Sequence, residues 1–313
     1  MTTSTEAEQQ ASPPTQRGDR VFSGLAKAAG LTILAALAAV FIFLAIEGIP
    51  GINQPADNYA PLDSFLPYVG RLLYGTIFAA LIALVIAVPF ALGIALFISH
   101  YAPRVLAVPV AYLIDLLAAV PSVVFGLWGA RVLAPALVPF QKWLDEHLGF
   151  IPFFEGPASV TGKTVLTAGM VLAIMILPII TAICREIFAQ TPRLHEEAAL
   201  ALGATKWEMI RYSVFPYARS GMVSAVMLGL GRALGETMAV AMVLSASSVI
   251  TLNMISNTNP ATIASNIASS FAEATPDKLS VLIATGLVLF AFTFAVNFAA
   301  RAIVARSERK FTR

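Results

Sequence analysis

The chain has 313 residues, of which 58% are hydrophobic and only 12% charged, and its mean hydropathy is +0.80. This charged share is about half that of an ordinary soluble domain, which excludes a typical water-soluble fold and indicates a membrane protein. The formal net charge of +2 and the lack of basic clusters before the C-terminal tail argue against a nucleic-acid binder, and the single cysteine, Cys184, excludes an internal disulfide and a cysteine zinc site.

The first 25 residues are rich in Thr, Ser, Gln, Glu and Pro and contain few apolar side chains. Such a segment lacks the apolar surface that would stabilise a fold, so we predict a disordered cytoplasmic tail over residues 1–25. A cleaved signal peptide is the alternative interpretation. The long polar lead and the full spanning length of the apolar run that follows both argue against it.

Six apolar stretches follow, each long enough for the roughly 20 helical residues that cross a bilayer. Backbone groups have no water to bond inside lipid, so these stretches must be helices. The sequence therefore predicts an all-α, polytopic membrane protein with a transmembrane domain over residues 26–304 and a basic cytoplasmic tail over 305–313. The predicted spans are residues 26–46, 71–99, 108–133, 165–184, 220–245 and 279–304.

Basic residues are distributed unevenly among the segments that join these spans. They gather before the first span, between the fourth and fifth, and after the sixth, whereas residues 47–70 and 249–277 contain no Lys or Arg. By the positive-inside rule, both termini and the loop between spans four and five are cytoplasmic. The outer loop after the third span contains FQKWLDEHLGF (residues 140–150), an amphipathic piece expected to lie at the membrane interface.

The cytoplasmic loop reads TPRLHEEAALALGATKWEMIRYSVFP over residues 191–216. Pro192 fits the start of a helix, the glutamates that follow suit its positive N-terminal end, and the alanines and Gly203 leave a slim surface that a partner can approach. Helical spacing is expected to continue through Trp207 until Pro216 interrupts it. An ordinary loop helix with no partner is the alternative interpretation.

Charged residues within the spans are few. Arg232 and Glu236 lie four positions apart in the fifth span and are expected on one helix face, turned to the bundle interior or an aqueous path. Arg232 can offer paired donors to phosphate oxygens, and Glu236 could position it or weaken anion binding. The alternative is an internal salt bridge that only locks the helix. Arg71, at the outer end of the second span, is expected to extend into lipid headgroups.

No catalytic motif is present. GPASVTGKT (residues 156–164) has five residues between its first Gly and the GK pair where a phosphate-binding loop has four, and HExxH, GxSxG and GxGxxG patterns are absent from the sequence. We therefore predict a transport subunit that binds no cofactor and is not an enzyme. Any ATP hydrolysis belongs to a separate subunit.

Several stretches together carry a resemblance to a known family. EAALALG, with Pro216 thirteen positions after its glycine, resembles the coupling motif of permeases in ATP-binding cassette (ABC) importers. Other stretches are similar to the C-type permeases of phosphate-specific importers: AAVPSVVFGLWG (118–129), LPIITAICREIF (177–188), GLGRALGETMAVAMV (229–243) and ATIASNIASSFAEA in the last outer loop. Ser213 and Phe215 depart from the usual apolar residues before the proline, which puts only local packing in question.

The resemblance implies the type I ABC importer permease fold, with six transmembrane helices and a cytoplasmic coupling helix, in the cytoplasmic membrane of a prokaryote. It implies a heterodimer with a second, A-type phosphate permease, two ATPase subunits that use ATP and Mg, and an extracytoplasmic phosphate-binding protein. It assigns contact with the ATPase to Glu196, Glu197, Ala198, Ala199, Gly203 and Ala204.

Two other functions are weighed against phosphate import. An ABC permease could carry another oxyanion, such as molybdate or sulfate, or an organic solute, although GRALGETMAV favours an oxyanion of the phosphate kind. A secondary transporter working alone would commonly show more spans or an inverted repeat, and neither is visible.

Overall fold

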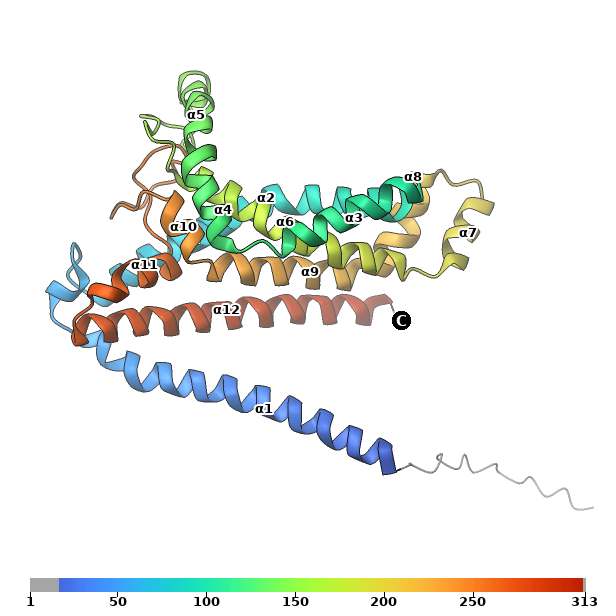
Figure 1. Ribbon diagram of the computed structural model, residues 1–313, viewed down its shortest axis with the longest axis horizontal. Coiled ribbons are helices and arrows are strands. Elements are labelled where there is room, and N and C mark those ends of the chain that lie inside the picture. The colour runs from blue at the N-terminus through green and yellow to red at the C-terminus, as the bar shows by residue number, and fades with distance from the viewer. Residues whose placement is uncertain (1–16, 312–313) are drawn as a thin grey trace, which may run out of the picture.

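The computed structural model describes residues 17–311, and of residues 17 and 305–311 it describes the backbone alone. Over this range the fold is all-α (Figure 1), with one isolated bridge between Ser247 and Pro260. The α-helices are α1 (Arg17–Gly48), α2 (Phe65–Leu96), α3 (Arg104–Ala118), α4 (Ser122–Trp128), α5 (Ala134–Leu148), α6 (Val165–Ala189), α7 (Arg193–Ala201), α8 (Lys206–Met209), α9 (Phe215–Gly235), α10 (Met238–Val243), α11 (Ile263–Ser270) and α12 (Pro276–Phe311). Short 3₁₀ turns are η1 (Ile49–Asn53), η2 (Ala56–Tyr59) and η6 (Phe271–Glu273), and π-helical turns are η3 (Phe97–Tyr101), η4 (Gly129–Leu133) and η5 (Ile210–Val214).

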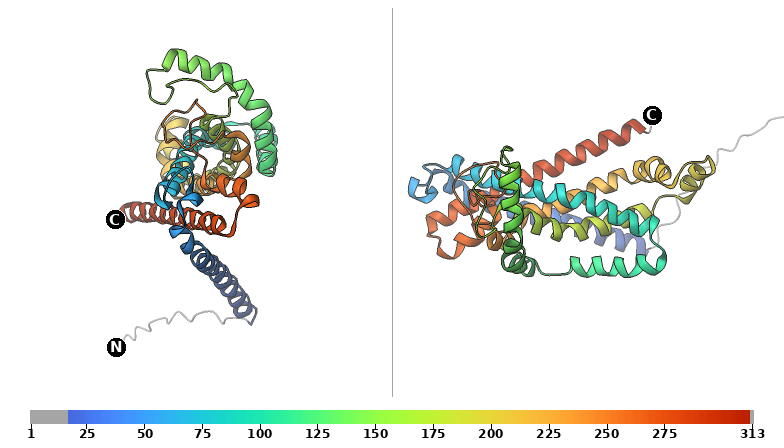
Figure 2. Two further views of the ribbon diagram at one scale, coloured as in Figure 1. Left: turned by 90° about the vertical axis from the view of Figure 1, so that its left-hand side faces the viewer. Right: turned by 90° about the horizontal axis from the view of Figure 1, so that it is seen from above.

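The centre of the bundle is the packing of α2 against α6, with α9 alongside α6. Ala83, Ala87, Ala91 and Ala95 recur every four residues on α2 and are fully buried. A stripe of small side chains lets two helix backbones approach closely, which is a common basis of helix association in membranes. The long helices run roughly along one axis, while α5 lies across it (Figures 1 and 2).

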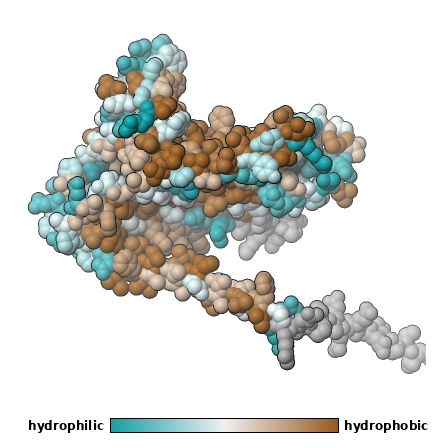
Figure 3. Space-filling model, viewed as in Figure 1, coloured by the Kyte–Doolittle hydropathy of each residue, from teal (hydrophilic) through white to brown (hydrophobic). Residues whose placement is uncertain are grey.

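Five helical segments of the described chain are long and apolar enough to cross a membrane: Gly18–Asn53, Phe65–Tyr101, Ser122–Leu148, Val165–Ala189 and Pro276–Val304. The fifth predicted span corresponds to α9, which has 21 residues, lies in the same bundle and is less apolar because it contains Arg219 and Arg232. Apolar side chains cover the middle of the visible surface and polar ones gather toward the ends (Figure 3), as expected for a bilayer-spanning bundle.

The third predicted span, residues 108–133, differs from the structure. The chain leaves the helix after Ala118 and resumes it at Ser122, with Pro121 as the N-cap residue. Proline lacks an N–H donor and disfavours a helical conformation in the residue before it, so the break falls here. The amphipathic piece at 140–150 is consequently not a separate helix but mostly the end of the continuous rod Ser122–Leu148, which runs across the bundle (Figure 1).

The predicted tails also differ in part. Helix α1 already begins at Arg17, because Val21, Phe22 and Leu25 continue the apolar surface of the first span, so residues 17–25 are helical. Residues 1–16 lie outside the described residues. At the other end, α12 continues to Phe311 and includes most of the predicted basic tail.

Helix α1 diverges from the rest of the bundle (Figure 1). It meets α12 toward its C-terminal half, where the rings of Phe41 and Phe290 lie 5.8 Å apart and Gly48 approaches the backbone of Ala284. Its remaining apolar side chains are exposed, for example Leu31 at 67% and Leu34 at 66%. In a membrane these side chains contact lipid or another subunit.

Close packing at the break in the third span depends on Gly126. A Cβ atom there would lie 2.7 Å from the Cα atom of Ala239, so α4 and α10 meet almost backbone to backbone. We expect Gly126→Ala to destabilise the protein by about 1–3 kcal/mol through overpacking. The measurement is the thermal unfolding midpoint of the purified protein. Gly93→Ala is the matched control, because a Cβ at Gly93 meets nothing within 4 Å, and a midpoint lowered equally in both variants would contradict the explanation.

Candidate functional site

The segment 191–216, called the coupling segment below, projects from one end of the bundle (Figure 1). None of the residues of α7 is buried. Several large apolar side chains on the segment are exposed, among them Leu194 at 75%, Leu202 at 91% and Trp207 at 53%. Exposed apolar groups on a projecting helical element, beyond the apolar belt, indicate a surface that another protein covers.

Gly203 ends α7 in a left-handed conformation, with φ of +86°. The N–H of Gly203 donates to the carbonyl of Leu200, and the N–H of Ala204 donates to that of Ala199. This pair of bonds is the Schellman motif, which satisfies the last carbonyls of a helix and favours glycine at the left-handed position. We predicted Gly203 for its small size, but a Cβ there would meet nothing within 4 Å, so the backbone conformation is what requires glycine.

Replacing Gly203 with alanine is therefore expected to strain the end of α7 by roughly 1–2 kcal/mol without any steric clash. The expected result is a loosened coupling segment, measured as faster amide hydrogen exchange over residues 196–204, while the bundle helices exchange at the wild-type rate. Gly231→Ala serves as control, since Gly231 has no positive φ and open space around its Cα atom. Unchanged exchange in Gly203→Ala would contradict the proposed role of the glycine.

A capping box follows the glycine at the start of α8. The hydroxyl of Thr205 accepts from the N–H of Glu208, and the Glu208 carboxylate accepts from the N–H of Thr205 at 2.8 Å. These hydrogen bonds from Thr205 lower the pKa of the Glu208 carboxyl. Glu208 thus remains ionised at neutral pH and fixes the direction in which the chain leaves the turn.

The coupling segment is tied to the bundle through η3, the end of the α2 rod. Nε2 of His100 lies 3.4 Å from Oε1 of Glu196, and the Nζ atom of Lys206 lies 4.7 Å from the centre of the Tyr101 ring. The hydroxyl of Ser213 donates to the carbonyl of His195. The first two contacts join the coupling segment to the end of the α2 rod, and the third joins α7 to η5.

Pro216 does not interrupt the helix as predicted. The chain is helical without a break from Lys206 through η5 into α9, and Pro216 sits in the first turn of α9. A proline inside a helix clashes with the carbonyl four residues before it, and the wider π-helical turn at Ile210–Val214 relieves this contact. Residues 206–235 therefore form one continuous helical rod that begins within the coupling segment.

The structure places the predicted coupling residues on one projecting element. Glu197 and Ala198 are exposed, whereas Glu196, Ala199 and Ala204 are half-buried against the rest of the chain. Glu196, predicted only as a docking residue, also contacts the bundle through His100. His100 and Tyr101 were missed, because nothing in the sequence near them signals that the end of α2 meets α7.

Arg232 and Glu236, the second predicted pair, do not lie on one helix face. Helix α9 ends at Gly235, and Glu236 is in an extended conformation with ψ of 126°. Its buried carboxylate accepts from the N–H of Ala239 at 3.2 Å, at the start of α10. The alternative of an internal salt bridge is also wrong, since no ion pair joins the two side chains within the described residues.

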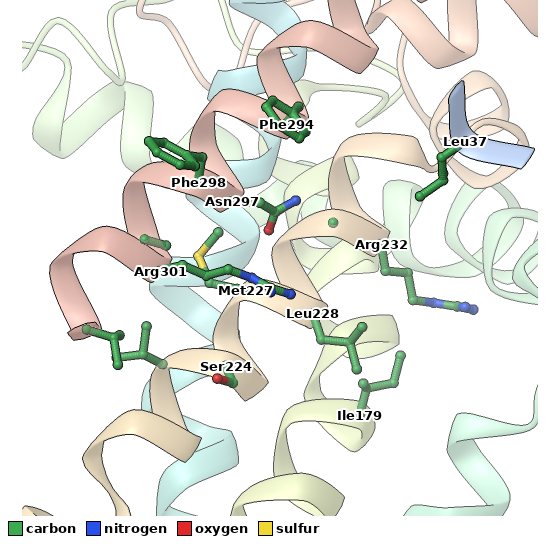
Figure 4. Close-up of a pocket in the computed structure, with 14 residues that line it drawn as sticks. Leu37, Ile179, Ser224, Met227, Leu228, Arg232, Phe294, Asn297, Phe298 and Arg301 are labelled. Atoms are coloured by element: carbon green, nitrogen blue, oxygen red, sulfur yellow. The ribbon is translucent and has the colours of Figure 1, made fainter. Parts of the chain in front are cut away.

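Arg232 instead lines a groove of about 1050 Å³ between α9 and α12 (Figure 4). Arg301 lines the same groove from α12. Figure 4 shows the Arg232 side chain pointing away from Arg301. No carboxylate lines the groove within the described part of the chain. The groove is therefore apolar with two cations, a composition that tolerates a passing anion. The sequence showed Arg301 only as one of several basic residues near the last span.

A second ion pair joins α3 and α6. Nη2 of Arg185 lies 3.5 Å from Oδ2 of Asp115, and the Asp115 side chain is about half exposed. An exposed pair of this kind contributes little stability, and it marks the level at which α3 and α6 run side by side.

Comparison with known proteins gives a consistent result. The family described as binding-protein-dependent transport system inner membrane component matches residues 87–309. The chain is 48% identical to the phosphate transport system permease protein PstC 2 of Mycobacterium tuberculosis, covering 93% of each chain. It is 40% identical to a phosphate transport system permease protein PstC of Xylella fastidiosa, covering 94% of this chain and 93% of the relative.

Solved structures agree on the fold. The methionine ABC transporter MetNI, in inward-facing conformations, is 18% identical with a TM-score of 0.51 and covers 76% of this chain and 93% of the matched chain. A bacterial ABC transporter involved in import of the acidic polysaccharide alginate is 16% identical with a TM-score of 0.51, covering 92% and 99%. At these identities the likeness establishes the architecture alone.

Proposed function

The chain belongs to the family of binding-protein-dependent transport system inner membrane components, and we propose from this that it is the membrane-spanning subunit of an ATP-driven importer of inorganic phosphate. The observation that carries the proposal is the 48% identity to a phosphate transport permease over 93% of both chains. It is a transport subunit rather than an enzyme, and ATP is hydrolysed by a separate subunit of the importer.

The geometry supports the mechanical part of this function. An importer must convert closure of its ATPase into movement of membrane helices, and a contact can transmit force only if it is rigid on both sides. The coupling segment offers exposed Leu202 and Trp207 to a partner, and behind them one unbroken helix leads from α8 into α9. We propose that Glu196, Glu197, Ala198, Ala199, Gly203 and Ala204 form the ATPase-facing surface.

We propose that Arg232 lies on the path of the cargo. Displacement of α9 moves Arg232 relative to α12, and the guanidinium can pair with phosphate oxygens as it moves. We propose that Glu236 does not position Arg232. Its carboxylate accepts from the N–H of Ala239 and so stabilises the start of α10. Both residues remain our proposed pathway residues.

The assembly that this function requires is larger than one chain. The importer combines the permease with an ATPase and an external binding protein. We propose in addition a second permease of the A type, two ATPase subunits that bind ATP and Mg, and a phosphate-binding protein, with no cofactor held by this chain. We also propose that the coupling segment and both termini face the cytoplasm of a prokaryotic cell, which the basic loops support.

Transport by the reconstituted importer tests the proposal. The importer is placed in proteoliposomes with ATP inside, and uptake of labelled phosphate, sulfate and molybdate is measured at equal concentrations. We expect ATP-dependent uptake of phosphate in clear excess over the other two. Preferential uptake of sulfate or molybdate would replace the cargo but keep the ABC mechanism, and purification without any ATPase would contradict the mechanism itself.

A further inference from the structure

Arg71 does not extend into lipid headgroups, as its position at the outer end of α2 led us to expect. Its side chain is buried, with 7% of the residue exposed, and its Nε atom has no hydrogen-bond partner. A buried Nε–H donor of a guanidinium that lacks a hydrogen-bond partner is costly, because arginine stays charged at every physiological pH. Such a group is retained in a fold where it meets a ligand or an opposing charge.

The guanidinium borders a hollow of about 360 Å³ at the outer end of the molecule. Four parts of the chain line it: Pro61 in the loop before α2, α2 itself, the segment that follows α10, and α11. Its polar lining consists of Arg71, Ser247, Ser248 and Asn266. At roughly 30 Å³ for each water molecule, the hollow has room for a small oxyanion together with several waters.

The charge around the hollow is positive. The ring of Tyr68 lies beneath two cations, with Cζ of Arg71 at 5.4 Å and Nζ of Lys278 at 4.8 Å from its centre. The Tyr68 hydroxyl accepts from the amide of Asn266 at 2.9 Å, which holds the ring and α11 together. Within residues 17–304, neither cation has a carboxylate oxygen within 4.0 Å.

The segment over the hollow is held close to α2 by Gly75, one helical turn beyond Arg71. A Cβ atom at Gly75 would lie 2.5 Å from the carbonyl oxygen of Ala261, which also borders the hollow. The N–H of Ile263 donates to the hydroxyl of Thr76 at 2.9 Å. These contacts fix the segment that carries Ser247, Ser248 and Asn266 against α2, where Arg71 lies.

We propose that this hollow is an outer binding site for a tetrahedral oxyanion of the phosphate type, with Arg71 as its charged donor and Ser247, Ser248 and Asn266 as neutral donors. A cation, several hydroxyl and amide donors and no carboxylate suit an anion with oxygens on every side. The role of this site in receiving the cargo before Arg232 rests on the proposed function. Binding of an oxyanion in the hollow does not depend on that function.

Two sources can supply the same chemistry: free phosphate and the phosphate group of a lipid. Hydrogen exchange of the intact importer distinguishes them, because it reads residues 246–262 separately from phosphate sites on the ATPase. One set of nanodiscs contains only phosphatidylcholine, with inorganic phosphate titrated against potassium chloride at equal ionic strength. The other contains phosphatidylglycerol and no inorganic phosphate.

In phosphatidylcholine nanodiscs, inorganic phosphate is expected to slow exchange over residues 246–262. Arg71→Gln is expected to raise the phosphate concentration for half-maximal protection roughly ten- to hundredfold, the loss typical of a hydrogen bond to a charged group. Lys142→Gln, which removes an exposed basic residue of α5 distant in sequence from the hollow, should behave as wild type. If Arg71→Gln does not assemble, the double variant Ser247→Ala, Ser248→Ala leaves the buried cation in place and should weaken protection severalfold.

Protection by phosphatidylglycerol alone that Arg71→Gln abolishes would support the site and identify a lipid phosphate as its occupant. The proposal is overturned if neither phosphate nor phosphatidylglycerol slows exchange, or if Arg71→Gln or the double serine variant is protected at wild-type concentrations. Labelled uptake is measured on the same preparation. Uptake of sulfate in place of phosphate, with sulfate protecting residues 246–262 through Arg71, would refute the proposed cargo and leave the oxyanion site standing.

Discussion

Replacing Leu202 with glutamate is expected to abolish ATP-driven phosphate uptake while leaving the membrane bundle intact. Leu202 is 91% exposed at the end of α7, so a charge there costs the isolated chain almost nothing. If the coupling segment is inserted in a groove of the ATPase, the same charge is desolvated without a partner. A central interface position of this kind is worth about 2 kcal/mol or more, a loss of at least roughly thirtyfold in affinity.

Three measurements on the purified importer check this expectation: the amount of ATPase that co-purifies, ATP hydrolysis, and uptake in proteoliposomes. All three should fall together in Leu202→Glu, with an unchanged thermal unfolding midpoint of the permease. Val160→Glu is the matched control, because Val160 is 80% exposed in the loop between α5 and α6, away from the coupling segment in sequence. Wild-type ATPase binding by Leu202→Glu would show that the end of α7 is not an interface.

The sequence predicts most of the fold because lipid imposes strong constraints on it. Residues 165–184 and 279–304 are long apolar runs, and inside a bilayer a run of that length has no alternative to a helix. The segment 108–133 looks equally apolar, yet Pro121 breaks it while Pro216 lies within a continuous helix. The difference is the π-helical turn before Pro216, which depends on packing of the whole segment rather than on local sequence.

The candidate sites also differ in whether local sequence or distant packing determines them. The coupling segment was predictable because its signals are local: a proline, two glutamates and a glycine in sequence order. The relation of Arg232 to Glu236 was not, since their spacing suits one helix face and only the structure shows α9 ending at Gly235. Nor could the burial of Arg71 be predicted, because the chain that covers it lies more than 170 positions away in sequence.

Replacing Arg232 with glutamine is expected to lower phosphate uptake roughly ten- to hundredfold with assembly and ATP hydrolysis retained. Glutamine keeps a polar, hydrogen-bonding side chain but loses the charge, and a hydrogen bond to a charged group is worth about 1.5–3 kcal/mol. Arg232 is exposed, borders the groove and has no ion-pair partner among the described residues. Its loss should therefore affect the passing anion more than the stability of the bundle.

Two further variants separate a transport role from a structural one. Arg219→Gln, on the same helix and also exposed, removes an identical charge near the end of α9 that joins the coupling segment and should keep wild-type uptake. Glu236→Gln retains a carbonyl oxygen that can accept from the N–H of Ala239, so it should lower uptake less than Glu236→Ala, which loses the cap.

The same measurements test whether Arg232 acts on the anion or on the stability of α9. If Arg232 served only to stabilise α9, then Arg232→Gln would lower the unfolding midpoint, and uptake per assembled importer would stay normal. If Arg232 pairs with the anion, the midpoint stays unchanged and uptake falls. Because the structure assigns Glu236 to the cap of α10 and not to Arg232, combining Arg232→Gln with Glu236→Gln should give additive losses in the free energy of activation for transport.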